Sequence, residues 1–278
     1  MPNISLPPLH KRAGNWLLNT YETSLVTFSG LPLAITFDRG WTDSYAIGFT
    51  VRNLLTGNVI AQKAWCGGLG CAIVVNGVIH IFGSTAWGIN GNRIIHSTLD
   101  ANYNPSQPND VLVADSTYRI LNTDVCATPN GFALTYETTS GIYFMTSPDM
   151  VSWASVQNAS IHQGQYCACP SIHYVNGAYH LTYLSHLEGK YVTQVSKSSN
   201  LINWTDFSGN TKYLSYICLI APDGNGEGIN SSDVSMTECG SFVYGVYMNG
   251  DQTTWAHLKT FVYFGSMAAL FAEFFPTA

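Results

Sequence analysis

The feature that most constrains the fold of this chain is a short unit that occurs twice. Residues 147–153 and 198–204 both read S-x-(D/N)-(L/M)-x-x-W. Upstream of each unit, two β-rich runs flank an Asn-Gly pair, at residues 130–131 and 176–177. Repetition at such a spacing is typical of architectures in which each repeat is one supersecondary unit. The chain is therefore expected to be built from similar β-rich repeats.

Asn-Gly between alternating apolar runs is the strongest short-range signal for a β-hairpin. It occurs again at residues 76–77, and weaker forms occur at residues 29–30 and 239–240. Hairpins at intervals of about 50 residues, without long helical patterns between them, predict an all-β chain forming a single five-bladed β-propeller domain over residues 1–278. Residues 1–15 are expected to form an extended N-terminal segment.

Other architectures fit the spacing less well. Six or seven blades would need about 40 residues each, and a β-sandwich leaves the repeated hairpin-plus-Trp unit unexplained. The last predicted strand, over residues 258–264, is expected to pair with the N-terminal strand and so close the ring, because an open strand edge favours aggregation.

The composition of the chain limits the kinds of partner that it is expected to bind. Charged residues are only 10% of the chain, the net charge is −6, and the Lys and Arg residues form no run. A nucleic-acid partner requires a basic footprint, so none is expected. The apolar stretch over 261–275 is too short and too interrupted to span a membrane. The first sixteen residues lack the apolar core of a secretion signal, which predicts a soluble, cytoplasmic protein.

The seven cysteines form no zinc-type spacing and are expected to be reduced and mostly buried. We therefore expect no metal and no cofactor.

Four further segments carry a resemblance. They are 122–126 with 136–137, 168–172, 230–234 and 250–252. Together with the S-x-D-L-x-x-W units, they resemble the five-bladed glycosidases of glycoside hydrolase family 43, in an uncharacterised branch. The resemblance implies three carboxylates in a central pocket: an Asp base, an orienting Asp and a Glu acid. Where it places the acid, this chain reads Cys-Ala-Cys-Pro over 167–170.

The carboxylates of the chain supply four candidate catalytic residues. Glu137 follows the mostly apolar run 132–136, and apolar surroundings raise the pKa of a carboxyl group, as a general acid requires. The alternative is a carboxylate at the rim of the pocket, held by a backbone turn. Asp233 is a candidate pocket carboxylate, with an Asx-turn as the alternative. Asp124 begins an inner strand and is a candidate pocket residue, with a cap at the strand edge as the alternative. Asp38 is the candidate base, with an ordinary Asp–Arg turn as the alternative.

Candidate substrate-binding residues combine aromatic faces with polar groups. They are Trp41, Trp87, His173, Asn230, Glu227 and Gln252. The function they predict is hydrolysis of a small oligosaccharide or glycoside in an axial pocket by carboxylate acid/base chemistry. The alternative is a non-catalytic, lectin-like propeller. A protein-binding scaffold is a weaker hypothesis, because W-D and kelch signatures are absent.

Overall fold

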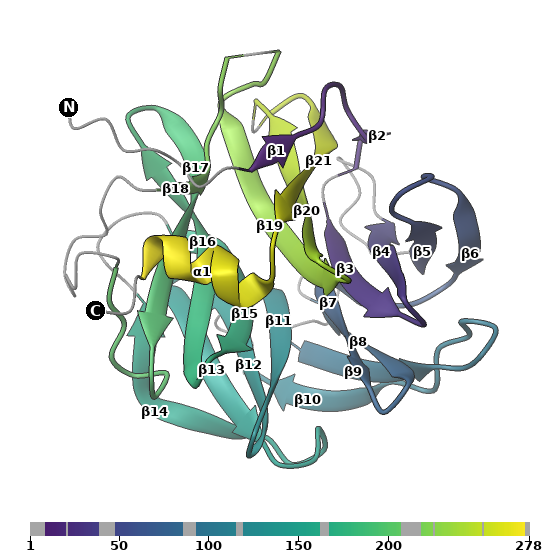
Figure 1. Cartoon of the computed structure of the whole chain (residues 1–278). Coiled ribbons are helices and arrows are strands. Elements are labelled where there is room, and N and C mark those ends of the chain that lie inside the picture. Colours follow the sequence, from purple (N-terminus) through teal and green to yellow (C-terminus); the bar gives the residue numbers. More distant parts are fainter. Residues whose placement is uncertain are drawn as a thin grey trace.

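The computed structural model describes residues 9–20, 22–38, 48–85, 93–114, 119–161, 167–206, 218–224, 226–251 and 253–275, with the side chain of Asp38 left out. Within these ranges the chain is almost entirely β-strand (Figure 1). Three sheets have four antiparallel strands each. The first sheet consists of β3 (Thr23–Phe28), β4 (Leu31–Asp38), β5 (Gly48–Asn53) and β6 (Val59–Lys63). The second consists of β7 (Gly68–Val75), β8 (Val78–Ser84), β9 (Arg93–Leu99) and β10 (Asn109–Val113). The third consists of β11 (Ile120–Thr128), β12 (Gly131–Thr138), β13 (Gly141–Ser147) and β14 (Ala154–Ile161).

The remaining strands join into one nine-stranded sheet. It contains β15 (Cys167–Val175), β16 (Ala178–Leu187), β17 (Lys190–Ser198), β18 (Cys218–Ile220), β19 (Asn230–Cys239), β20 (Phe242–Gly250), β21 (Ala256–Phe264), β1 (His10–Lys11) and β2 (Leu17–Leu18). Two antiparallel runs, β15–β18 and β19–β21, are connected by a short parallel pairing in which Tyr191 faces Asn230 and Val192 faces Ser231.

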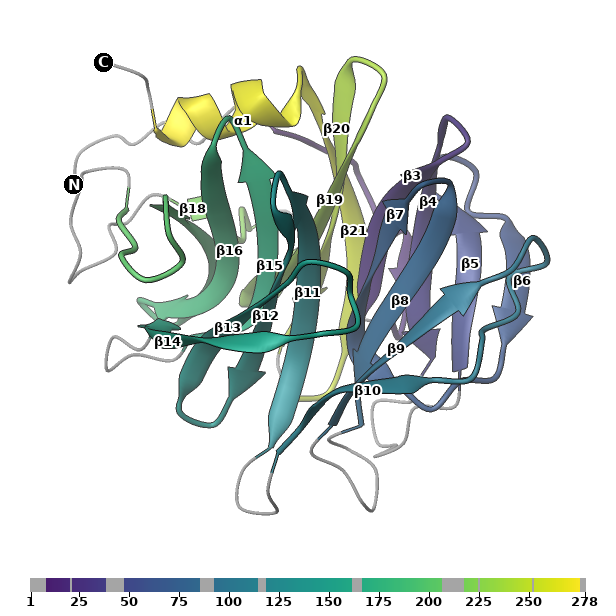
Figure 2. The same cartoon turned by 90° about the horizontal axis from the view of Figure 1, so that it is seen from below.

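The sheets lie side by side around a common axis, and the first strand of each antiparallel run lies nearest to it (Figures 1 and 2). These inner strands contact one another in a closed cycle, from β3 to β7, β11, β15, β19 and back to β3. Apolar side chains fill the spaces between neighbouring sheets. A cycle of antiparallel sheets packed face to face is the arrangement of a β-propeller.

The N-terminal segment pairs with the last strand, as predicted. His10 and Lys11 of β1 face Val262 and Phe261 of β21, and Leu17 and Leu18 of β2 face Leu258 and His257. The segment covers the outer edge of β21, so this strand does not present a free edge. The α-helix that follows, α1 (Met267–Phe274), has eight residues, and no helix in the described part of the chain could span a membrane.

The two S-x-(D/N)-(L/M)-x-x-W units have the same local structure. In the first, Asp149 Oδ1 accepts the backbone N–H groups of Val151 and Ser152, and Trp153 Nε1 donates to the carbonyl of Met150 at 3.0 Å. In the second unit, Asn200 accepts from residues 202 and 203, and the Trp204 indole donates to the carbonyl of residue 201 at 2.8 Å. Both Trp residues are therefore structural and equivalent, which confirms the repeat.

Candidate functional site

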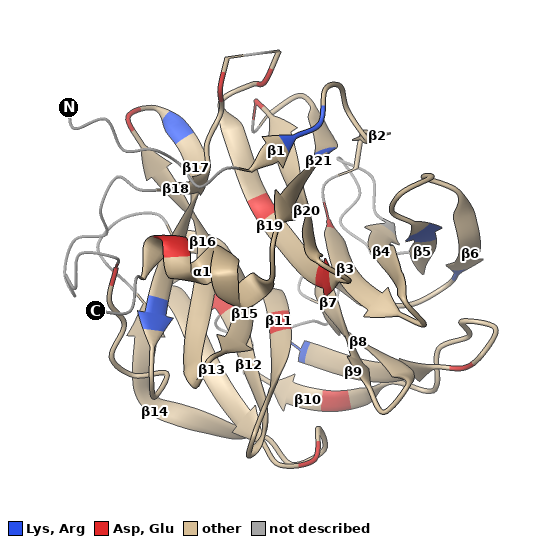
Figure 3. Ribbon diagram, viewed as in Figure 1, with Lys and Arg blue, Asp and Glu red and all other residues tan. Residues whose placement is uncertain are grey.

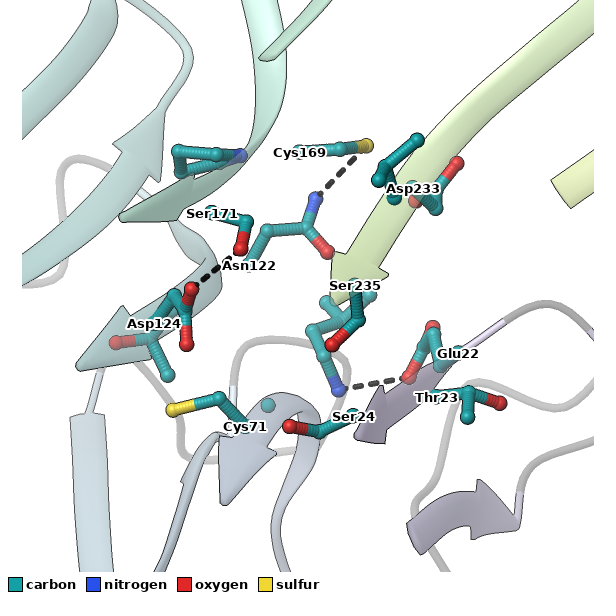
Figure 4. A pocket seen from close by; sticks show the side chains of 15 residues that line it. Glu22, Thr23, Ser24, Cys71, Asn122, Asp124, Cys169, Ser171, Asp233 and Ser235 are labelled. Carbon is teal, nitrogen blue, oxygen red and sulfur yellow. Dashed lines mark hydrogen bonds between the residues drawn. The ribbon is translucent and has the colours of Figure 1, made fainter. Parts of the chain in front are cut away.

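A small pocket lies at one end of the axis, where the inner strands begin (Figure 4). Each inner strand, or the residue just before it, contributes three consecutive residues: 22–24, 69–71, 122–124, 169–171 and 233–235. The cavity measures about 50 Å³. None of its lining residues is basic, whereas β11 and β19 carry acidic residues at this level (Figure 3). The sequence thus brings carboxylates together without a neighbouring Lys or Arg on the pocket wall.

The third residue of each triplet connects neighbouring inner strands. Ala72 N–H donates to Ser24 Oγ at 2.9 Å, and Leu25 N–H donates to Ser235 Oγ at 2.9 Å. Asp124 occupies the equivalent position, and its Oδ2 accepts from Ile172 N–H at 2.8 Å and from Ser171 Oγ at 2.7 Å. Burial raises the pKa of Asp124, while these hydrogen bonds lower it. Asp124 therefore faces the pocket and also holds β11 against β15.

The first residue of four triplets adopts left-handed backbone. Leu69, Asn122, Cys169 and Asp233 have φ values of 49°, 23°, 50° and 50°. Each lies where the pairing with the second strand of its sheet shifts register. A β-bulge redirects a side chain, and left-handed backbone is uncommon for residues other than glycine. Such strain is concentrated at functional sites in many proteins, and here it recurs around one cavity.

Glu22 is a pocket residue that was not predicted from the sequence. Its carboxylate is buried and accepts the backbone N–H of Leu69 at 2.7 Å. The signal was available in the spacing of the repeats. Residue 22 precedes its turn glycine at residue 30 by the same interval as residue 69 precedes 77 and residue 169 precedes 177. Aligning the repeats on their turn glycines would have placed Glu22 on the pocket wall.

Glu137 lies on β12, one layer behind the pocket wall. It is 6% exposed, and its Oε2 accepts from Asn122 Nδ2 at 2.7 Å and from the backbone N–H of Cys169 at 2.8 Å. Burial, and to a smaller extent the charge of Asp233, raise the pKa of Glu137 to about 7, against the lowering effect of these hydrogen bonds. A carboxyl group with such a pKa holds a proton near neutral pH, as a general acid requires.

Asp233 lines the pocket and is half-buried. It accepts a hydrogen bond from the Ser232 hydroxyl, and its carboxylate lies close enough to the Cys169 thiol to act on it electrostatically. Burial raises the pKa of that thiol well above its usual value, and the charges of Asp233 and Glu137 raise it further. Cys169 is therefore a neutral hydrogen-bond donor and not a thiolate nucleophile.

Three other predicted residues lie elsewhere. His173 lines a second chamber of about 320 Å³ further along the inner strands, where burial lowers its pKa to about 4. The Asn230 side chain is fully buried behind the pocket wall and has no hydrogen-bond partner among the described residues. Glu227 pairs with Lys11 at 2.8 Å and with Lys259 at 3.1 Å, away from the pocket. None of these three side chains lines the acidic pocket.

The last four predicted residues cannot be placed in the same way. Asp38 ends β4, but its side chain lies outside the described part of the structure. Trp41, Trp87 and Gln252 also lie outside the described residues.

Comparisons with known proteins give a clear likeness in structure but none in sequence. No protein-family model matches the chain, and a search of curated proteins finds no relative. Among solved structures, the chain is similar to an exo-1,5-α-L-arabinanase from a bovine ruminal metagenomic library, with a TM-score of 0.67, 10% identity, and 90% of this chain and 94% of that chain covered.

Two further solved structures are similar over nearly their whole length. The α-L-arabinofuranosidase from Podospora anserina, solved in complex with cellotriose, has a TM-score of 0.65 and 8% identity, covering 92% of this chain and 98% of its own. A family 43 endo-arabinanase from Bacillus licheniformis has a TM-score of 0.60 and 13% identity, covering 87% and 93%. At these identities the likeness concerns the fold, and it shows that the chain has the propeller fold of the family 43 type of glycoside hydrolase.

Proposed function

We propose that this chain is a glycoside hydrolase that cleaves a small oligosaccharide or glycoside at the acidic axial pocket. The observation that carries the proposal is the proximity of Glu137, which lies just behind the pocket wall with a pKa of about 7, to Asp233, which lines the pocket and raises that pKa by its charge. Glycosidic cleavage needs one protonated carboxyl and one ionised carboxylate. The fold that the chain shares with two arabinanases and an arabinofuranosidase also supports the proposal of a glycoside hydrolase.

The proposal includes a single five-bladed propeller domain. We count β3–β6, β7–β10, β11–β14, β15–β18 and β19–β21 as the blades, with the N-terminal β1 and β2 completing the last one. The closed cycle of contacts between the five inner strands supports this count, because each blade of a propeller contacts two neighbours. The parallel pairing between β17 and β19 then joins two neighbouring blades through only two residue pairs.

In the proposed reaction, Glu137 donates its proton to the leaving glycosidic oxygen as the bond from that oxygen to the anomeric carbon breaks. Its Oε2 accepts two hydrogen bonds, whereas Oε1 has no partner among the described residues and is the oxygen left to carry the proton. Asp233 remains ionised and supports the positive charge that develops at the anomeric carbon. Water supplies the new oxygen, and a pocket carboxylate accepts its proton; Glu22 is our candidate for this base in place of Asp38.

A non-catalytic, lectin-like role is the second candidate. It is favoured by the first pocket residue of β11 and of β15, because these residues, Asn122 and Cys169, are not carboxylates as Glu22 and Asp233 are. Amide and thiol groups can hold a sugar hydroxyl but cannot move a proton at neutral pH.

The test is hydrolysis of a panel of aryl glycosides and oligosaccharides, including arabinan fragments, followed by variants on any substrate that is cleaved. We expect Asp233→Asn and Glu22→Gln each to lower kcat/KM at least about a hundredfold. Glu188→Gln is the matched control, because this carboxylate is exposed in the turn between β16 and β17. Binding without cleavage of any sugar would favour the lectin-like role, and full activity of both pocket variants would refute the proposed mechanism.

A further inference from the structure

Asn122 and Cys169 both donate hydrogen bonds to Glu137, the proposed acid, and both line the pocket that contains Asp233 (Figure 4). Asn122 Nδ2 lies 2.7 Å from Glu137 Oε2 and 3.5 Å from Cys169 Sγ, which is within the wider range of a sulfur acceptor. The Cys169 backbone N–H donates to Glu137 at 2.8 Å, and the charge of Asp233 acts on the Cys169 thiol. We propose that Asn122 and Cys169 form a hydrogen-bonded bridge, completed by donation from the Cys169 thiol to Asp233, that joins Glu137 to Asp233 and positions both carboxylates.

The residues of the bridge come from three neighbouring runs of antiparallel strands. Glu137 belongs to the sheet of β11, Cys169 to β15 and Asp233 to β19. Each of Asn122, Cys169 and Asp233 lies at a bulge with left-handed backbone, so the chain departs from regular pairing at all three positions that form the bridge. Such conformations persist only where the surroundings determine them.

Cys169 suits the bridge chemically. Its sulfur accepts from the Asn122 amide, which leaves its single proton for Asp233 in the proposed bridge. A carboxylic acid at this position would place a third titrating group beside Glu137 and Asp233. A neutral thiol keeps Asp233 hydrogen-bonded as an acceptor without adding a charge to the pocket. Cys169 is therefore a positioning residue, and it acts on the reaction through Asp233.

The first experiment measures the thiol in the protein without any substrate, so it does not depend on the proposed function. An infrared difference spectrum between the native protein and Cys169→Ala isolates the S–H stretching band of Cys169. The same difference is then recorded in an Asp233→Asn background. We expect the band to lie at lower frequency in the native protein and to move upward when the carboxylate acceptor is lost. An identical band in both backgrounds would overturn the bridge.

Cys218→Ala is the matched control, because this thiol is buried in β18 and does not line the pocket. Its S–H band should be unchanged by Asp233→Asn. If Cys169→Ala does not fold, Cys169→Ser replaces it, and the S–H band is isolated against that variant instead.

The second experiment concerns catalysis and rests on the proposed function. On a cleaved substrate, Cys169→Ala should lower kcat about tenfold or more and raise the pH of the acidic limb of kcat/KM, because Asp233 loses a donor to its ionised form. Cys169→Ser retains a donor and should stay within about threefold of the native rate. Equal loss in both variants, or an unmoved pH profile, would overturn the positioning role. If no sugar is cleaved while the infrared shift is present, the proposed function fails and the bridge stands.

Discussion

The backbone N–H of Cys169 donates a hydrogen bond to Oε2 of Glu137 at 2.8 Å, across the boundary between two neighbouring sheets. On the opposite side of the pocket, the N–H of Leu69 makes the equivalent bond to Glu22 at 2.7 Å. In both cases a residue in left-handed backbone directs its N–H at a buried carboxylate. The bulges therefore hold the carboxylates of two different sheets as well as redirecting side chains.

Glu137→Gln tests the proposed acid. The amide has nearly the same shape but carries no transferable proton, so turnover should fall about a hundredfold or more with a change in melting temperature of only a few degrees. Steady-state kinetics and thermal unfolding on the same preparation measure both. Full activity in this variant would remove Glu137 from the mechanism.

The pH dependence of activity should follow the same carboxyl group. Because the pKa of Glu137 is about 7, the acid form is present below that pH and is lost above it. The alkaline limb of kcat/KM is therefore expected near pH 7. An alkaline limb two or more pH units higher would assign the proton to a different group.

Stability should depend on pH through Glu137 with a defined sign. The folded-state pKa is raised from 4.5 to about 7, so the folded state binds more protons between these values and the unfolding free energy falls as pH rises through them. The loss is on the order of 3 kcal/mol or less. Urea unfolding of the native protein and Glu137→Gln at pH 4.5 and pH 8 measures it. Parallel changes in the two proteins would contradict this assignment.

Thiol reactivity distinguishes buried from exposed cysteines. Burial raises the pKa values of the Cys71, Cys126, Cys167, Cys169 and Cys218 thiols, whereas Cys66 is exposed and Cys239 is half-buried. Since the thiolate is the reactive form, iodoacetamide at pH 8 should modify Cys66 first and leave Cys169 unmodified in the folded protein. Peptide mass spectrometry after timed quenching gives the order. Early modification of Cys169 would contradict its place in the bridge.

The Glu227 network should be structural. Burial by itself raises the pKa of Glu227, but the hydrogen bonds from Lys11 and Tyr247 outweigh it and leave the pKa below its usual value. Removing the charge in Glu227→Gln leaves the buried Lys259 without its partner, which should cost about 3–5 kcal/mol in the free energy of unfolding.

The matched comparison for Glu227 is the exposed Arg93–Asp110 pair. Both side chains are more than 40% exposed, and Asp110→Asn should cost less than about 1 kcal/mol. Denaturant titrations of both variants test the difference. A Glu227→Gln variant as stable as Asp110→Asn would show that the buried network is dispensable.

Much of the fold was predictable because its signals are local. Asn-Gly pairs determine hairpins, and the hydrogen bonds of Asp149 and Asn200 close a turn within a few residues. The pairing of the last strand with the N-terminal segment was also predicted, from the general cost of an open edge.

The candidate site was only partly predictable. Glu137, Asp124 and Asp233 were predicted from local motifs. Glu22 was not, because its place on the pocket wall emerges only when the repeats are aligned in register. Glu227 was assigned to the substrate, since the sequence shows its glycine-rich surroundings but not Lys11 and Lys259, which lie far away in the chain.

The repeating strands and their turns follow from the amino-acid sequence alone, since each depends on neighbours within a few residues, and the low charge follows from composition. Which carboxylates share the axis, and which of them has a raised pKa, depends instead on the tertiary structure. Closing the ring brings residue 22 beside residues 69 and 233, and burial of Glu137 behind Asn122 and Cys169 raises its pKa. Both effects depend on the removal of water by segments distant in the chain, so no local pattern encodes them.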